Sequence, residues 1–118
     1  MQILKANEGE TVERTGAPIF EGQVHGRSLP ESEHLNAAIV SFAAGARTKM
    51  HRHTSDQLLY IVSGIGKVGD RDGEHIVSVG DSIVIPANTD HWHGAGDTGA
   101  PMSHLTVQQK GSETTVLD

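Results

Sequence analysis

The sequence predicts an all-β fold, either a sandwich or a barrel. From Gln57 onward, short runs rich in β-branched and aromatic residues recur at intervals of roughly 8–12 residues, with turn residues between them. Glycine is also in excess, because 14 of the 118 residues is roughly 12%, against a usual ~7%. The four prolines are not clustered, so the glycines indicate turns rather than a linker. We expect a single domain over residues 1–118.

The predicted strands follow one another through the second half of the chain. Gln57–Ser63 is a dense β-branched and aromatic run that Gly64 closes, and Ile65–Val68 follows it. The segment Gly69–Gly73 (GDRDG) predicts a hairpin turn, because an Asp-Gly pair readily adopts the positive φ angles that such turns need. The remaining predicted strands are His75–Val79, Ser82–Ile85 and Met102–Gln109.

The first third of the chain is less regular. Apolar residues in Glu31–Ala44 fit both helical spacing and an extended strand, so periodicity alone leaves this segment open. We interpret Leu35–Ala43 as a strand, in keeping with the rest of the chain.

Composition excludes several classes of function. The fifteen acidic residues outnumber the nine basic ones and no basic stripe is present, so we expect neither a nucleic-acid partner nor an anionic-membrane role. The chain contains no cysteine, which excludes disulfides, thiolate zinc sites and thiol catalysis. Met1–Thr11 has no long apolar run, and we therefore expect a soluble, cytoplasmic protein.

Gly64, Gly66 and Gly69 spell a dinucleotide-binding fingerprint directly after a strand. That fingerprint requires a following helix, whose N-terminal amides bind the pyrophosphate. The next residues, DRDGEHIVSV, instead predict a turn and another strand. We interpret the glycines as part of a hairpin.

Five of the eight histidines fall in three short segments: His51 and His53, His91 and His93, and His104. Residues two apart in a strand share a face, so each His-x-His pair presents two imidazoles together. Turning such polar groups inward without partners costs ~1–3 kcal/mol each. A divalent ion, bound with ~10–16 kcal/mol at good structural zinc sites, can offset that penalty. Surface histidines without a role remain the alternative.

Two spacings now resemble the motifs of a known family, the cupins. The motifs read Gly45-(x5)-His51-x-His53-(x3)-Gln57-(x6)-Gly64 and Gly80-(x5)-Pro86-x-Asn88-(x2)-His91. The resemblance implies a jelly-roll type antiparallel β-barrel, and it favours the strand over the helix at Leu35–Ala43. It also implies a metal in the barrel mouth, with His51, His53, Gln57 and His91 as ligands.

The chain departs from the commonest cupin pattern at Gln57, which replaces a glutamate. Because glutamine is neutral, a bound ion would keep its full positive charge, which favours Lewis-acid over redox chemistry. Residues 44–109 are similar to the bacterial manganese-dependent cupin hydroxynitrile lyases, which cleave or form cyanohydrins such as mandelonitrile. That resemblance implies a catalytic role for His104 on the last long strand, with Gln108 on the same face.

Other residues near the motifs have two interpretations each. His93 could ligate in place of His91, although the spacing from Pro86 favours His91, with His93 as a substrate or ligand contact. Arg47 could contact substrate or form a structural ion pair. Lys49 is unusual for a pocket wall beside a metal. We expect Trp92 to pack on the outer face, and His25, His34 and His75 to lie on the surface.

We predict a metal-dependent lyase of the hydroxynitrile-lyase type acting on a small molecule. The alternatives are a cupin dioxygenase, a sugar isomerase and a non-catalytic ligand-binding cupin. We expect one divalent ion per chain, with manganese first and iron, cobalt, nickel or zinc also suited to the site. We also expect a homodimer, because Gln57–Val62 is apolar on both faces and the barrel interior covers only one.

Overall fold

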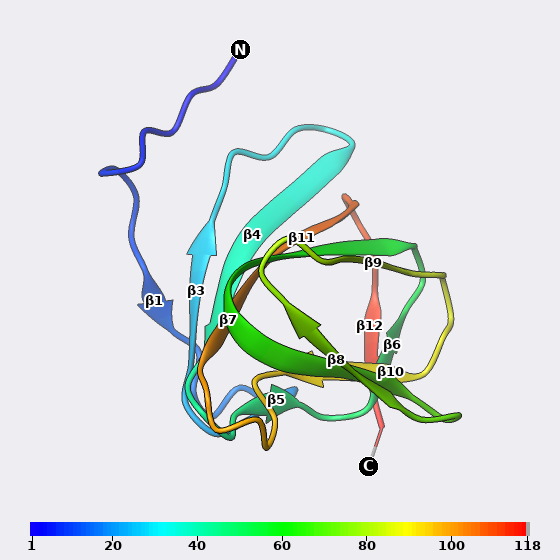
Figure 1. Cartoon of the computed structure of the whole chain (residues 1–118). Coiled ribbons are helices and arrows are strands. Elements are labelled where there is room, and N and C mark those ends of the chain that lie inside the picture. The colour runs from blue at the N-terminus through cyan, green and yellow to red at the C-terminus, as the bar shows by residue number, and fades with distance from the viewer. Residues whose placement is uncertain (118) are drawn as a thin grey trace.

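The computed structural model describes residues 1–117, which form twelve strands, all paired antiparallel, and no helix. The sheet curls on itself into the half-barrel seen in Figure 1. Consequently, nothing in this part of the chain is a helix long and apolar enough to cross a membrane. The strands are β1 (Val12–Glu13), β2 (Phe20–Glu21), β3 (Val24–Ser28), β4 (Leu35–Phe42), β5 (Arg47–Thr48), β6 (His51–His53), β7 (Gln57–Asp70), β8 (Glu74–Ser78), β9 (Ser82–Ile85), β10 (His91–Gly94), β11 (Met102–Gln109) and β12 (Thr114–Val116).

The main path of hydrogen-bonded strands is β1-β3-β4-β11-β7-β10-β5-β2. Strands β8 and β9 pair with β7, β6 pairs with β10, and β12 pairs with β6. The first half of β7 lies between β9 and β11, whereas its second half lies between β8 and β10. One long strand therefore joins the two walls of the barrel (Figure 1).

The predicted strands are confirmed with one correction. β9 and β11 have the predicted bounds, and β4 confirms the strand at Leu35 against the helical alternative. The prediction that Gly64 closes a strand is wrong, because β7 runs through this residue and is 14 residues long in all. Gly64 has a φ of 77°, and a Cβ there would collide with the carbonyl of Pro101. The glycine thus lets β7 continue past Pro101.

The hairpin interpretation of the glycine-rich segment is confirmed. Lys67 in β7 pairs with Ile76 in β8, and the backbone N–H of Asp70 donates to the carbonyl of Gly73 at 2.9 Å. Gly69 is needed for another reason, since a Cβ there would overlap the indole of Trp92.

Apolar and polar residues occupy different levels of the interior. Phe42 pairs with Met102 at one end of the β4–β11 ladder, and both are buried in the apolar core with Val24 and Ile61. Towards the other end of β11, Gln108 pairs with Gln57. His104 on β11 therefore lies between the apolar core at one end of the strand and the Gln108–Gln57 pair towards the other.

Candidate metal centre

All five histidines singled out from the sequence are buried, with exposed fractions of 0–6%. Gln57 is 4% exposed and Thr48 is 1% exposed. These seven are the buried polar or charged side chains of residues 1–117, and none of them is a carboxylate. The buried site is therefore built from neutral groups.

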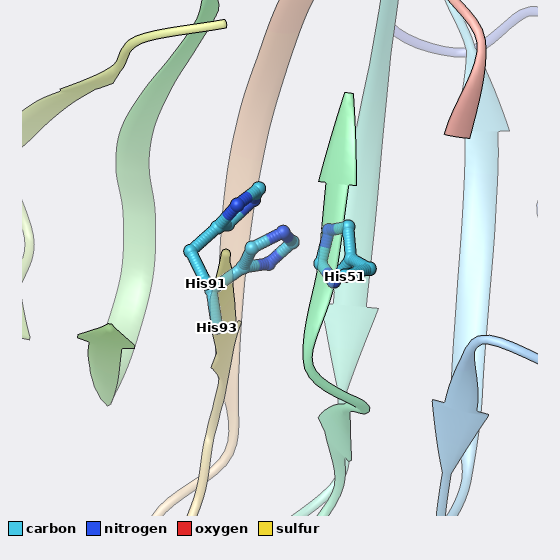
Figure 2. Close-up of side chains that lie close together, drawn as sticks. All are labelled: His51, His91 and His93. Atoms are coloured by element: carbon cyan, nitrogen blue, oxygen red, sulfur yellow. The ribbon is translucent and has the colours of Figure 1, made fainter. Parts of the chain in front are cut away.

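Strands β6 and β10 bring the two His-x-His pairs together. His51 on β6 is the direct antiparallel partner of His91 on β10, and His93 lies two residues further on the same face. Figure 2 shows the three side chains pointing toward one another. Their ligand nitrogens lie within 4.8 Å of one another, close enough to hold a metal ion.

Backbone carbonyls fix the orientation of two of these rings. His51 Nδ1 lies 2.8 Å from the carbonyl of Lys49, and His91 Nδ1 lies 2.8 Å from that of Thr89. A carbonyl only accepts, so each Nδ1 carries the hydrogen and donates it. In the neutral ring, each Nε2 then keeps its lone pair free to bind a cation.

Two threonines orient the other predicted ligands. His53 Nδ1 lies 2.8 Å from Thr114 Oγ1, and its buried Nε2 has no hydrogen-bond partner among residues 1–117. Gln57 Nε2 donates to Thr106 Oγ1 at 2.8 Å, which leaves its Oε1 facing His91 Nε2 at 3.2 Å. Because both of those atoms present lone pairs, the contact is one that a shared cation would stabilise.

The electrostatics of the cluster also suit a cation. Burial, together with the nearby His91, lowers the pKa of His51 to about 3. Burial, with His91 again contributing, lowers the pKa of His53 to about 4, and burial lowers the pKa of His91 as well. These imidazoles are therefore neutral near pH 7, which is the form that binds metals. The donor set fits one divalent ion.

A second pair of histidines lies beside this cluster. His104 Nε2 is 2.9 Å from His93 Nδ1, and Phe42 packs against both rings at centroid distances of 5.6 and 6.0 Å. Burial lowers the pKa of His104 to about 4, and burial together with His104 lowers the pKa of His93 well below its usual value. The backbone N–H of His93 donates to Thr48 Oγ1 at 3.0 Å. His93 thus lies between His104 and the nitrogens of His51 and His91.

The remaining predicted site residues lie in different places. Gln108 is the register partner of Gln57, and its buried Nε2 lacks a hydrogen-bond partner within residues 1–117. The Arg47 guanidinium lies 3.6 Å from the centre of the Trp92 ring. Trp92 points to the opposite side of β10 from the histidines, as predicted, so Arg47 is not brought to the cluster. Lys49 contributes its carbonyl, while its side chain lines a surface cavity with Arg47.

Sequence reasoning did not find the threonines that orient the ligands. Thr106 shares a face with His104 in β11, which is a local signal that could have been used. Thr114 lies 61 residues from His53 and meets it only because β12 pairs with β6. No local pattern predicts that contact.

Comparison with known proteins gives a consistent result. The cupin domain family matches residues 38–108. A protein named (R)-mandelonitrile lyase, from Granulicella tundricola, is 35% identical over 83 residues, which cover 69% of this chain and 62% of that protein. An acireductone dioxygenase from Leptospira biflexa is 48% identical over 48 residues, which cover 37% of this chain and 27% of that protein. The chain therefore spans less than two-thirds of these relatives.

Solved structures agree on the fold. A cupin-like protein from Thermotoga maritima superposes with a TM-score of 0.84 at 27% identity. The superposition covers 92% of this chain and 86% of the Thermotoga chain. The polyketide cyclase RemF from Streptomyces resistomycificus gives a TM-score of 0.82 at 16% identity. That superposition covers 100% of this chain and 87% of RemF. At that identity the second likeness concerns the fold alone.

Proposed function

This chain belongs to the cupin family, and we propose that it is a metal-dependent lyase of the hydroxynitrile-lyase type. The observation that carries this proposal is the hydrogen-bonded pair of neutral histidines, His93 and His104, beside a cluster of neutral metal donors. Such a site can polarise an oxygen and move a proton without a carboxylate. The similarity to a protein named (R)-mandelonitrile lyase supports the same reaction class.

We assign the metal to His51, His53, Gln57 and His91, with manganese first among the candidate ions. In each of the three histidines Nδ1 is held by a carbonyl or a threonine hydroxyl, and the amide nitrogen of Gln57 donates to Thr106, which fixes the ring and amide orientations. When bound, a divalent ion with four neutral ligands supplies Lewis-acid polarisation of a substrate oxygen.

The histidine pair can serve as the proton acceptor. Both rings are neutral near pH 7, so one hydrogen lies between His93 Nδ1 and His104 Nε2. If His93 donates it, His93 Nε2 presents a lone pair to the interior and acts as a base. A proton taken up at His93 Nε2 can be balanced by transfer of the shared hydrogen to His104. His104 therefore acts through His93.

In cyanohydrin cleavage, the hydroxyl proton of the substrate passes to His93 Nε2. The O–H electron pair forms the carbonyl as the carbon–carbon bond breaks, and the electrons of that bond leave with cyanide. Cyanide then takes the proton back from the histidine pair and leaves as hydrogen cyanide. Losing a general base of this kind typically lowers a rate ~100-fold or more.

The test is turnover of mandelonitrile by protein loaded separately with manganese, iron, cobalt, nickel and zinc. We expect benzaldehyde release by at least one loaded form, no release after treatment with a chelator, and recovery when the metal is restored. Metal-loaded protein that leaves mandelonitrile unchanged in every form would overturn the proposal.

The second candidate is a dioxygenase, which the 48% identity to an acireductone dioxygenase segment favours. The two functions differ in their need for oxygen, since cyanohydrin cleavage consumes none. Activity that survives strict removal of oxygen supports the lyase, whereas activity that stops supports the dioxygenase. A sugar isomerase or a non-catalytic binding cupin would show neither reaction.

A further inference from the structure

A cavity of about 250 Å³ opens where the edge of one barrel wall, β3 and β4, comes close to β2. Its apolar lining is Phe20, Ala38 and Val40, and two arginines, Arg14 and Arg27, border it. An apolar cavity with a few polar groups at its border is the usual form of a small-molecule site.

The floor of this cavity is one layer of side chains away from the histidine pair. Val40 is the direct cross-strand partner of His104 between β4 and β11, and Ala38 is the partner of Thr106. Directly opposed residues share a face, with Cβ atoms about 4.5–5.5 Å apart. Phe20 meets Phe42, which packs on both histidines, at a centroid distance of 6.1 Å. One layer of side chains, which includes Phe42, therefore separates the cavity from the histidine pair.

Arg14 is positioned on the inner side of the sheet edge. Its backbone N–H donates to the carbonyl of Val24 at 2.7 Å, which extends the β1–β3 pairing by one residue. Val24 is fully buried, so the Arg14 side chain starts from the inward face. A Cβ placed on Gly26 would lie 3.4 Å from Arg14 Nε and 3.5 Å from Arg14 Cγ. The arginine therefore lies across Gly26 at the border of the cavity.

The two arginines at this border differ in their partners. Arg27 Nη2 donates to the carbonyls of Lys5 and Glu8 at 3.1 and 2.8 Å, so it holds the N-terminal segment. The Arg14 guanidinium makes no hydrogen bond or ion pair with any residue in 1–117. Its five donors are therefore available to an anion, and guanidinium geometry matches a carboxylate.

We propose that this cavity binds the organic group of a small substrate, and that Arg14 pairs with a carboxylate on that group, remote from the reacting carbon. Arg14, Phe20 and Gly26 precede the segment 38–108 that matches the cupin family, so this recognition belongs to the chain's own N-terminal part. The inference rests on the proposed function only for the identity of the reacting group. The ligand class is a small carboxylate with an apolar body, such as an aromatic acid.

The test measures binding of 4-(hydroxymethyl)benzoate and of benzyl alcohol to the metal-free protein by NMR. We expect Arg14→Met to weaken the carboxylate about 5-fold or more while leaving benzyl alcohol within about 2-fold, with Arg14→Lys intermediate. Arg71→Met is the matched control, because Arg71 pairs with Asp90 elsewhere on the surface and should affect neither ligand. Contacts between the ligand ring and the Val40 methyl groups should place the ligand in the cavity.

The inference is overturned if Arg14→Met leaves carboxylate binding unchanged, if Arg71→Met weakens it equally, or if the ring contacts lie away from Val40. These outcomes are separate from the fate of the proposed function, because mandelonitrile carries no carboxylate. Turnover of mandelonitrile without Arg14-dependent binding of the carboxylate refutes the proposed ligand site alone. Arg14-dependent binding without turnover refutes the lyase alone.

Discussion

The two faces of the first half of β7 contrast sharply, although their sequences are almost equally apolar. Gln57, Leu59 and Ile61 point inward and are 4%, 0% and 0% exposed. Their neighbours Leu58, Tyr60 and Val62 point outward and are 39%, 43% and 40% exposed. The inner face is covered by the core and the histidines, whereas nothing within residues 1–117 fully covers the outer face.

The contrast indicates that the inner face of β7 serves the chemistry of the site and the outer face serves association. Inside, polar groups are buried and oriented by specific hydrogen bonds, so small changes there should alter the chemistry. Outside, apolar side chains remain half exposed, so changes there should alter association instead.

The largest effect should come from the histidine pair. His104→Ala removes the partner of His93 and should lower lyase turnover by ~100-fold or more, because the proton can no longer be shared. Metal content should stay near that of the parent, since His104 reaches the cluster only through His93. Turnover of mandelonitrile and metal analysis on the same sample check both points.

Loss of metal from that variant would make His104 a ligand. Full activity with the metal retained would instead place proton transfer elsewhere.

A smaller effect should follow from the threonine behind His53. Thr114→Val removes the hydroxyl that lies 2.8 Å from His53 Nδ1 and orients the ring. Hydrogen bonds to the non-ligating nitrogen of a metal-binding histidine are typically worth ~10–100-fold in metal affinity. Thr115→Val is the matched control, because Thr115 lies next to Thr114 in β12 but pairs with Arg52 rather than with a ligand. Metal titration of both variants measures the difference. Equal affinities would remove Thr114 from the site.

The inner histidines should also make the metal-free protein acid-sensitive. The pKa is about 3 for His51 and about 4 for His53 and His104 in the folded chain, against ~6.5 when unfolded. Between these pH values the unfolded chain binds more protons than the folded chain. The contribution of these histidines to the free energy of unfolding should therefore be full above about pH 6.5 and should decrease as the pH drops towards 4.

Urea unfolding at several pH values measures this slope. The exposed His75 provides a control, because His75→Ala should leave the slope unchanged. A flat profile would contradict burial of the neutral imidazoles.

The smallest effect on the site should come from the outer face. We propose that Leu58, Tyr60 and Val62, together with Val84 on β9, form the contact of a homodimer. Leu58→Lys should convert a dimeric mass to a monomeric one while metal content and turnover remain within about 2-fold. Ile76→Lys is the control, because Ile76 is 71% exposed but lies on β8.

Sedimentation at micromolar concentration distinguishes the dimer from the monomer. A parent protein that is already monomeric would refute the proposed interface.

Much of this architecture is predictable from the chain because its signals are local. The alternation in Met102–Gln109 and the Asp-Gly turn each specify their own geometry, and the two His-x-His pairs indicate where a metal could bind. The passage of β7 through Gly64 was not predictable, since it depends on the carbonyl of Pro101 far along the chain. The contact of His53 with Thr114 likewise depends on long-range pairing.

The nitrogens of His51, His91 and His93 all lie within 4.8 Å of one another, so the metal ligands among them are distinguished by measuring metal binding rather than by distance. The direct measurement is metal content per chain for His51→Ala, His91→Ala and His93→Ala after identical loading. We expect the first two variants to lose stoichiometric metal, whereas His93→Ala should keep about one ion per chain and lose turnover. Loss of the metal from His93→Ala, with retention by His91→Ala, would contradict the division between ligands and proton-transfer residues.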